Sequence, residues 1–248
     1  YNSALQFIPI SQITGTGDGN QFYSLFRDSK GFYWFGGANG LIRFTDPAGE
    51  RHDAIWYRMG DKTYPLSHNR IRHIYEDKEQ QLWIATDGSI NRYDYATRQF
   101  IHYNIVDSTG MYNTNWTYYI FEDTAGQLWI STCLGGIFVV DKRKLMQSTS
   151  GQYIAEQNYS VHNGLSGMFI NQIIPDNEGN VWVLLYNNKG IDKINPRTRE
   201  VTKLFADELT GEKSPNYLLC DEDGLLWVGF HGLSLIHISE PTRLLSIS

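Results

Sequence analysis

The stretch "DTAGQLWIST" at residues 123–132 decides the fold, because it is one of five copies of a single pattern. In every copy an aspartate precedes a tryptophan by six residues, and in four copies a glycine precedes it by three, with Gln80 as the one departure. The other copies are "DSKGFYWFGG" (28–37), "DKEQQLWIAT" (77–86), "DNEGNVWVLL" (176–185) and "DEDGLLWVGF" (221–230). The tryptophans lie 49, 46, 53 and 45 residues apart, a period typical of a repeat protein.

Each copy lies between segments that are typical of strands. An apolar run such as "WTYYIF" (116–121) precedes the aspartate, and the tryptophan stands in a second run. A glycine with an apolar run, as in "GGIFVV" (135–140), and a variable segment such as "QFIHYN" (99–104) follow. Four short strands at this period predict an all-β fold, a β-propeller of four-stranded antiparallel blades with about five blades present. These segments lack the apolar spacing of a helical solenoid.

The repeated residues are expected to be structural. An aspartate at the start of a turn accepts backbone N–H bonds, a glycine supplies the positive φ that closes the hairpin, and the tryptophan fills the wedge between blades. A calcium loop needs alternating oxygen ligands and a glutamate at its twelfth position, whereas a strand follows directly here, so we expect no metal. The motif residues are Asp28, Trp34, Asp77, Trp83, Asp123, Trp129, Asp176, Trp182, Asp221 and Trp227.

Composition narrows the classes of protein. The formal net charge of −6 and the lack of a basic run argue against nucleic-acid binding. Cys133 and Cys220 are spaced for neither a zinc site nor a disulfide scaffold, so each is expected to be a small buried hydrophobe. No apolar stretch is long enough to cross a membrane and no signal peptide is visible. Either the protein is cytoplasmic, or a signal peptide and any membrane span lie outside this sequence.

The repeat resembles the two-component regulator propeller repeats. Residues 67–94 of this sequence, "SHNRIRHIYEDKEQQLWIATDGSINRYD", match the pattern of those repeats almost throughout. The resemblance covers residues 5 to about 235, and the fourth copy departs most, with Met168 where the first three copies have asparagine. It implies the periplasmic sensor region of a hybrid two-component histidine kinase of Bacteroidetes type, often one that detects glycan breakdown products. It also implies a fragment of a larger, seven-bladed propeller, and a homodimer in the full-length sensor.

The two ends of the sequence do not repeat. "LQFIPI" (5–10) resembles the outer strand that closes a propeller, so five blades could form a small ring with it or remain an open arc. The tail "HISEPTRLLSIS" (237–248) does not continue the pattern and resembles translated vector sequence. We therefore expect a propeller over residues 1–236 and a non-native tail over 237–248.

Candidate binding residues stand where the chain enters the first strand of a unit, because propellers bind ligands where these loops converge at one mouth of the channel. An asparagine lies eight residues before the motif aspartate in the first three copies, and its alternative role is to cap a turn. An aromatic ring with amide and guanidinium donors suits a sugar, although the tryptophan could equally pack in the core. The candidates are Asn20, Asn69, Arg70, Arg72, Asn115 and Trp116.

Three functions remain open from the sequence. The first is an extracytoplasmic sensor that recognises an oligosaccharide or another small ligand and signals to regulate glycan-utilisation genes. The second is a propeller enzyme, either a lyase or a glycan-degrading enzyme, and the third is a protein-interaction scaffold. His68, His73, His102 and His162 are scattered over different units, and no nucleophile elbow, phosphate loop or zinc motif is present. We therefore predict no catalytic residues and no cofactor in this segment.

Overall fold

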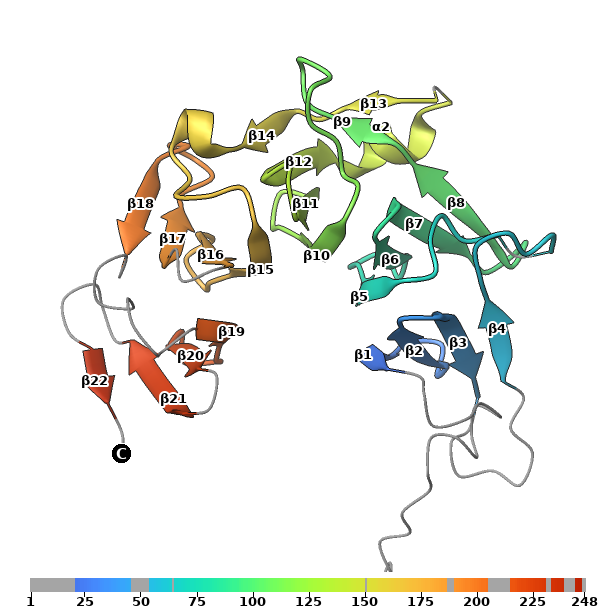
Figure 1. The fold of residues 1–248 in the computed structure, drawn as a ribbon, viewed down its shortest axis with the longest axis horizontal. Coiled ribbons are helices and arrows are strands. Elements are labelled where there is room, and N and C mark those ends of the chain that lie inside the picture. The colour runs from blue at the N-terminus through green and yellow to red at the C-terminus, as the bar shows by residue number, and fades with distance from the viewer. Residues whose placement is uncertain are drawn as a thin grey trace, which may run out of the picture. The chain divides into compact units, whose positions relative to one another are not determined.

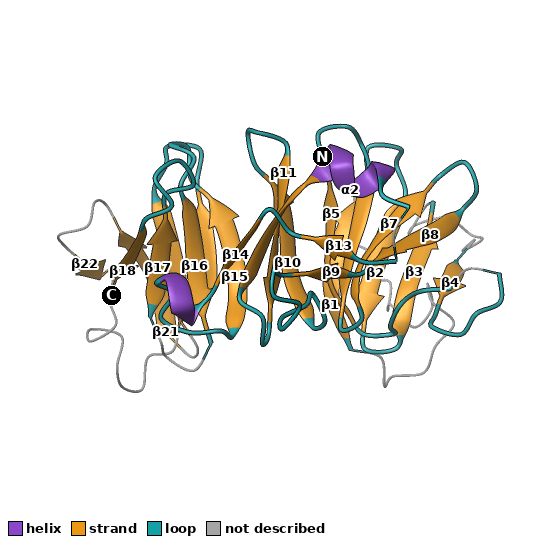
Figure 2. Ribbon diagram, turned by 90° about the horizontal axis from the view of Figure 1, so that it is seen from above, coloured by secondary structure: helices purple, strands orange, loops and turns teal. Residues whose placement is uncertain are grey.

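The structure is a computed structural model in which nearly all regular structure is β-strand (Figure 2). The chain divides into two compact units, Tyr1–His102 and Tyr103–Ser248. Side chains are described for residues 21–45, 54–63, 65–149, 151–186, 190–204 and 215–230, and the backbone alone for the strands at 233–238 and 244–246.

The first unit contains two four-stranded antiparallel sheets, in which the strands follow one another in chain order (Figure 1). The first sheet consists of β1 (Phe22–Arg27), β2 (Tyr33–Gly37), β3 (Gly40–Phe44) and β4 (Ile55–Tyr57). The second sheet consists of β5 (Ile71–Glu76), β6 (Leu82–Thr86), β7 (Ser89–Asp94) and β8 (Gln99–Tyr103). The first strand of the second sheet, β5, packs against β1 and β2.

The second unit contains three further four-stranded sheets. The third sheet consists of β10 (Thr117–Glu122), β11 (Gln127–Thr132), β12 (Ile137–Asp141) and β14 (Gln157–Tyr159). The fourth sheet consists of β15 (Ile170–Pro175), β16 (Val181–Leu185), β17 (Ile191–Ile194) and β18 (Val201–Leu204). The fifth sheet consists of β19 (Pro215–Cys220), β20 (Leu226–Phe230), β21 (Leu233–Ile238) and β22 (Leu244–Ser246). The predicted all-β fold of five four-stranded blades is confirmed.

The third copy of the repeat carries an insertion that we did not predict from the sequence. A short helix, α2 (Lys142–Gln147), follows β12, with the Asp141 side chain accepting the Lys144 N–H at its start. Two short strands, β9 (Ile105–Val106) and β13 (Tyr153–Ile154), pair in parallel outside the four-stranded sheet. Of these elements, α2 and β13 lie between the third and fourth tryptophans and account for the longest spacing of the repeat, 53 residues.

The end of the chain differs from expectation. Part of the segment 237–248, which we expected to be a foreign tail, supplies the end of β21 and the whole of β22, and β22 pairs with β21 as the outer strand of the fifth sheet. The expected closing strand, "LQFIPI" (5–10), lies outside the described residues. Whether 237–248 belongs to the natural protein stays a prediction.

The Asp–Trp turn has the same hydrogen bonds in all five sheets. In the third sheet, Asp123 Oδ1 accepts the backbone N–H of Ala125 at 2.8 Å and of Gln127 at 2.9 Å, as expected for an aspartate that begins a turn. Its other oxygen, Oδ2, accepts the indole N–H of Trp129 at 2.9 Å. The corresponding indole bonds of the other four copies are 2.6–3.0 Å long. The six-residue spacing is therefore the spacing that lets one carboxylate hold both the turn and the ring.

The glycine of the motif has the left-handed backbone that its position requires. Its φ is +87° at Gly31, +78° at Gly126, +85° at Gly179 and +81° at Gly224. Gln80 occupies the same position in the second sheet with φ of +60°, which is costly for a residue with a Cβ. The departure at Gln80 thus leaves the turn unchanged and stores strain in it.

The motif tryptophan packs between neighbouring sheets within the first unit. The ring of Trp34 is completely buried, stacks on Tyr57 of its own sheet at 5.8 Å and meets Tyr93 of the second sheet edge-on at 5.0 Å. Close approach needs a small residue two positions later, since a Cβ on Gly36 would lie 2.4 Å from Ile71 Cγ2. This packing explains why small residues follow the tryptophan in most copies.

Candidate functional site

The candidate site lies at the end of each hairpin opposite the Asp–Trp turn. Two positions meet there: the residue four places after the motif tryptophan and the residue seven places before the motif aspartate. In four sheets, the backbone N–H of the first donates to the carbonyl of the second, at 2.9–3.2 Å. We call these two residues a variable pair, because the backbone bond is shared and the side chains are not. The pairs are Gln21 with Ala38, Arg70 with Asp87, Trp116 with Cys133, and Phe169 with Tyr186.

A second variable position lies two residues further along the first strand. All five sheets have an irregularity in register there, so that one residue of the first strand has no direct partner on the second. Such bulges redirect a side chain relative to a regular strand. The bulged residues are Tyr23, Arg72, Tyr118, Asn171 and Asn216.

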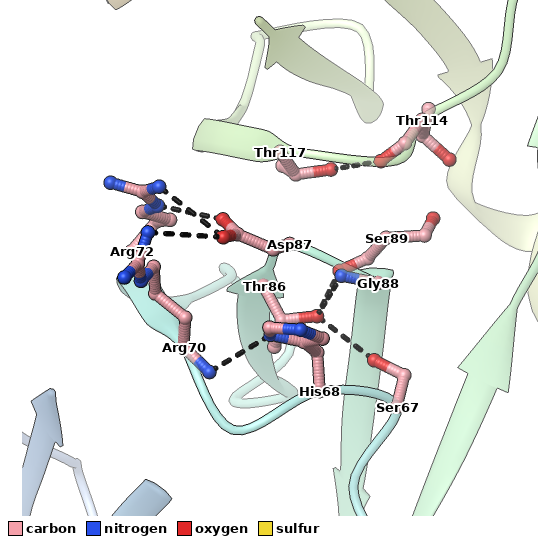
Figure 3. A network of polar contacts seen from close by, with 10 residues as sticks. All are labelled: Ser67, His68, Arg70, Arg72, Thr86, Asp87, Gly88, Ser89, Thr114 and Thr117. Atoms are coloured by element: carbon pink, nitrogen blue, oxygen red, sulfur yellow. Dashed lines mark hydrogen bonds and ion pairs between the residues drawn. The ribbon is translucent and has the colours of Figure 1, made fainter. Parts of the chain in front are cut away.

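In the second sheet these positions form an ion-pair cluster (Figure 3). Arg72 Nε lies 2.7 Å from Asp87 Oδ1, and Arg70 Nη1 lies 3.7 Å from Asp87 Oδ2. The Asp87 side chain is only 7% exposed, whereas that of Arg70 is 47% exposed. The structure thus brings the predicted residues Arg70 and Arg72 together, but their guanidinium groups already share one carboxylate that the sequence reasoning missed.

The loop before Arg70 is held by its own side chains (Figure 3). The hydroxyl groups of Ser67 and Thr86 lie 2.9 Å apart, and the Gly88 N–H donates to Thr86 Oγ1 at 3.0 Å. The ring nitrogen Nδ1 of His68 accepts the Arg70 N–H at 3.0 Å. His68 therefore caps a turn in this structure.

Ser67 is also fixed by a contact that recurs in the fourth sheet. Asn91 accepts the Ser67 N–H at 3.2 Å and donates to its hydroxyl at 2.7 Å. At the same place in the fourth sheet, Asp192 accepts both the N–H and the hydroxyl of Ser166, at 2.8 and 2.7 Å. Asp192 is 1% exposed, and this burial raises the pKa of its carboxyl despite the hydrogen bonds from Ser166.

The three candidate asparagines have different surroundings. Asn20 lies outside the described residues. Asn69 Oδ1 accepts the Met59 N–H at 2.8 Å, and in the fourth copy Met168 Sδ accepts the corresponding N–H of Val161 at 3.4 Å. These bonds favour the capping role for Asn69. The side chain of Asn115 is exposed and forms no hydrogen bond with any residue that the structure describes.

Trp116 is presented to solvent by a strained backbone. Its φ is +55° and its side chain is 48% exposed, so the ring is not a core residue here. Two bonds fix this conformation: the Trp116 carbonyl accepts the Cys133 N–H at 2.9 Å, and the Thr117 hydroxyl donates to the Thr114 carbonyl at 2.6 Å (Figure 3). A left-handed backbone at a bulky residue is a feature that collects at functional sites.

The fourth sheet presents two further rings that the sequence reasoning missed. Phe169 is 42% exposed and Tyr186 is 56% exposed, and they form the variable pair equivalent to Trp116 and Cys133. The strands that follow Trp116 and Phe169, β10 and β15, pack against each other. Counting seven residues back from each aspartate would have found Phe169, and counting four forward from each tryptophan would have found Tyr186.

Three further observations on the described residues concern metal binding, membrane spans and the cysteines. Within the described ranges, no three histidine, cysteine, aspartate or glutamate side chains are arranged to hold a metal ion. In that same part of the chain, neither helix combines the length and apolar character needed to cross a membrane. Cys133 is buried and Cys220 is partly buried, and neither of these two described cysteines forms a disulfide.

Comparison with known proteins agrees with this geometry. The two-component regulator propeller repeat matches residues 16–39 and 65–88. The chain is 93% identical over 98% of its length to a crystal structure of the extracellular domain of BT4673 from B. thetaiotaomicron, with a TM-score of 0.91. A second crystal structure of that domain, assigned to a hybrid two-component system, is 92% identical over the whole chain, with a TM-score of 0.92. No match to a curated protein was found.

A more distant structure shows the fold alone. The extracellular domain of BT3049, assigned to a hybrid two-component system of B. thetaiotaomicron, is 19% identical over 97% of the chain, with a TM-score of 0.76, and the chain covers 31% of it. The chain spans about a third of the BT4673 structures, 33% and 34% of their lengths.

The fold and the repeated turn define a β-propeller that is a fragment of a larger one. Two stretches of the chain, residues 16–39 and 65–88, are two-component regulator propeller repeats. Since its near-identical relatives are extracellular domains, this segment lies outside the cytoplasm.

Proposed function

We propose that this chain is part of the extracytoplasmic sensor of a hybrid two-component histidine kinase, that it recognises an oligosaccharide, and that it signals to regulate glycan-utilisation genes. The observation that carries the proposal is the identity of 92–93% to extracellular domains assigned to a signalling system. The segment itself is proposed to bind a ligand and not to catalyse a reaction.

The variable pairs support the choice of a sugar as ligand. Trp116, Phe169 and Tyr186 are aromatic side chains between 42% and 56% exposed, at positions where the repeat does not require an aromatic residue. A flat apolar ring is the group that packs against the C–H face of a pyranose, and neighbouring amides such as Asn115 can bond its hydroxyl groups. The remaining steps, packing of two sensor copies and signalling to the kinase, are expected in the full-length protein.

A thermal-shift screen against a panel of oligosaccharides tests the ligand class. A ligand at 100 times its Kd stabilises the protein that binds it by about 2.7 kcal/mol, which a melting experiment detects. The screen is run on this chain and on the complete extracytoplasmic domain. If no oligosaccharide shifts the complete domain, the sugar proposal fails. Turnover of any oligosaccharide in the panel, followed by chromatography, would instead support an enzyme.

A further inference from the structure

A cavity of about 440 Å³ lies in the second unit, between the loop before β10 and a segment that includes β14, the outer strand of the third sheet. One wall is the loop 107–112, which leads towards β10, and the other is the segment 155–163, which leads towards β15. This volume is within the range of about 300–1,000 Å³ that is typical of small-molecule sites. We call it the 107–163 pocket.

The first wall is preformed by an aspartate turn. Asp107 accepts the backbone N–H groups of Thr109 and Tyr112, at 3.1 and 2.8 Å, and its own N–H donates to the Tyr112 carbonyl at 3.0 Å. Burial acts to raise the pKa of Asp107, but the hydrogen bonds from the Thr109 hydroxyl and from the Tyr112 and Thr109 N–H groups outweigh it, so the pKa is lowered. The carboxylate is thus committed to its own loop.

The second wall is preformed by a capped turn, η1 (Val161–Asn163). The Ser160 N–H donates to Asn163 Oδ1 at 2.6 Å, and the Asn163 amide donates to the Asn158 carbonyl at 2.6 Å. The two walls meet where the Tyr112 hydroxyl lies 3.5 Å from His162 Nε2. A site whose walls are already ordered loses little conformational entropy when a ligand binds.

The charges of the pocket point to a neutral ligand. The described residues that line it include no lysine or arginine to hold an acidic group. Its two carboxylates both have partners: Asp107 in its turn, and Glu156 with the Asp141 N–H and the Tyr153 hydroxyl, each at 2.8 Å, and with Lys144 Nζ at 3.4 Å. A cation would therefore compete with partners that both carboxylates already have.

The groups that remain are those that bind sugar hydroxyls. The Tyr112 hydroxyl and the His162 ring contact each other, and each keeps a further donor or acceptor for a ligand, while Ser108 adds an exposed hydroxyl. Met111, with 71% of its surface exposed, offers an apolar contact at the same loop. From this set we infer that the 107–163 pocket binds one unit of a neutral glycan, one without carboxylate or sulfate groups. The inference rests on the proposed function and adds to it a location and a charge class.

Isothermal titration calorimetry on this chain tests the inference with two probe sets: neutral oligosaccharides and uronic-acid oligosaccharides of the same length. Tyr112→Phe and His162→Leu each remove a polar group from the pocket, and Tyr33→Phe, at a partly exposed tyrosine of β2 in the first unit, is the matched control. We expect binding of a neutral oligosaccharide, weakened about three- to tenfold by each pocket variant and unchanged by the control. Urea denaturation confirms that all three variants remain folded.

The other outcomes separate this inference from the proposed function. If a neutral oligosaccharide binds both pocket variants as tightly as the unaltered chain, the pocket is not its site, although the sugar-sensing proposal survives. Binding of uronic-acid oligosaccharides alone contradicts the neutral class and also leaves that proposal standing. If neither set binds this chain, the pocket inference is wrong, and the thermal shift of the complete extracytoplasmic domain then decides whether the sugar proposal also fails.

Discussion

The first and second strands of each sheet form a hairpin. The two ends of this hairpin differ in how much of their structure is the same from sheet to sheet. At one end, the Asp–Trp turn has the same hydrogen bonds in all five sheets. At the other end, the variable pair keeps only its backbone bond, and its side chains range from the Arg70–Asp87 ion pair to the Phe169–Tyr186 rings. A residue that must pack in every blade cannot vary, whereas a residue that faces solvent can be specialised. The comparison predicts that stability depends on the first end and recognition on the second.

The largest effect is expected at the conserved end, for Trp129→Ala. The ring is 1% exposed, stacks on Phe121 and Tyr159 with centroids 6.0 and 5.5 Å away, and holds the Asp123 carboxylate. Removing a buried tryptophan leaves a cavity and takes away the indole hydrogen bond to Asp123, so we expect a loss of about 3–5 kcal/mol in the free energy of unfolding. Urea denaturation followed by circular dichroism measures it. A loss below 1 kcal/mol would show that the turn does not depend on the indole.

The conserved end is also the part that could be predicted from the sequence. Five copies of one spacing establish the strand count, the turn and the buried ring, because each copy repeats the same physical requirement. The indole bond to the aspartate was not foreseen, since spacing alone does not say which way a ring nitrogen points. The α2 insertion and the partner of Arg72, Asp87, were also missed, because each occurs in one copy only.

The next largest effect on stability is expected at the turn position that is Gly126 in the third sheet and Gln80 in the second. Gly126→Ala places a Cβ at φ of +78° with no atom nearer than 3.8 Å, so the cost is conformational and not steric. We expect a loss of about 1 kcal/mol for this variant. Gln80→Gly makes the opposite change at φ of +60° and is expected to stabilise the chain by up to about 1 kcal/mol. If urea denaturation gives both variants the same sign, the strain at Gln80 is not what distinguishes the two turns.

A smaller effect, dependent on pH, is expected where a loop is tied to its sheet. Asp192 and Asn91 make the same contact with a serine, but the pKa of the Asp192 carboxyl is raised by burial above its usual value of 3.8. The folded state therefore favours the protonated acid. Its contribution to stability is complete below pH 3.8 and is lost as the pH rises through the folded pKa.

Asp192→Asn tests this sign. The amide can accept the Ser166 N–H and donate to its hydroxyl, as Asn91 does with Ser67, so the variant is expected to be at least as stable as the unaltered chain at pH 7. Its advantage, of about 1 kcal/mol, should shrink as the pH falls towards 4. Urea denaturation at pH 4, 5.5 and 7 measures this. An advantage that grows on acidification contradicts the assigned direction. Asn91→Asp is the reverse change and is expected to lose stability at pH 7.

The smallest effect on stability is expected at the variable end, for Trp116→Ala. The Trp116 ring is 48% exposed and alanine keeps the backbone bonds that fix the loop, so the free energy of unfolding should change by less than about 0.5 kcal/mol. If the ring contacts a sugar, the same change should weaken binding of a neutral oligosaccharide by about tenfold in calorimetry. A loss of stability comparable to that of Trp129→Ala would place the ring in the core. An unchanged stability with unchanged binding would assign recognition to other variable positions, because the ring would then serve neither purpose.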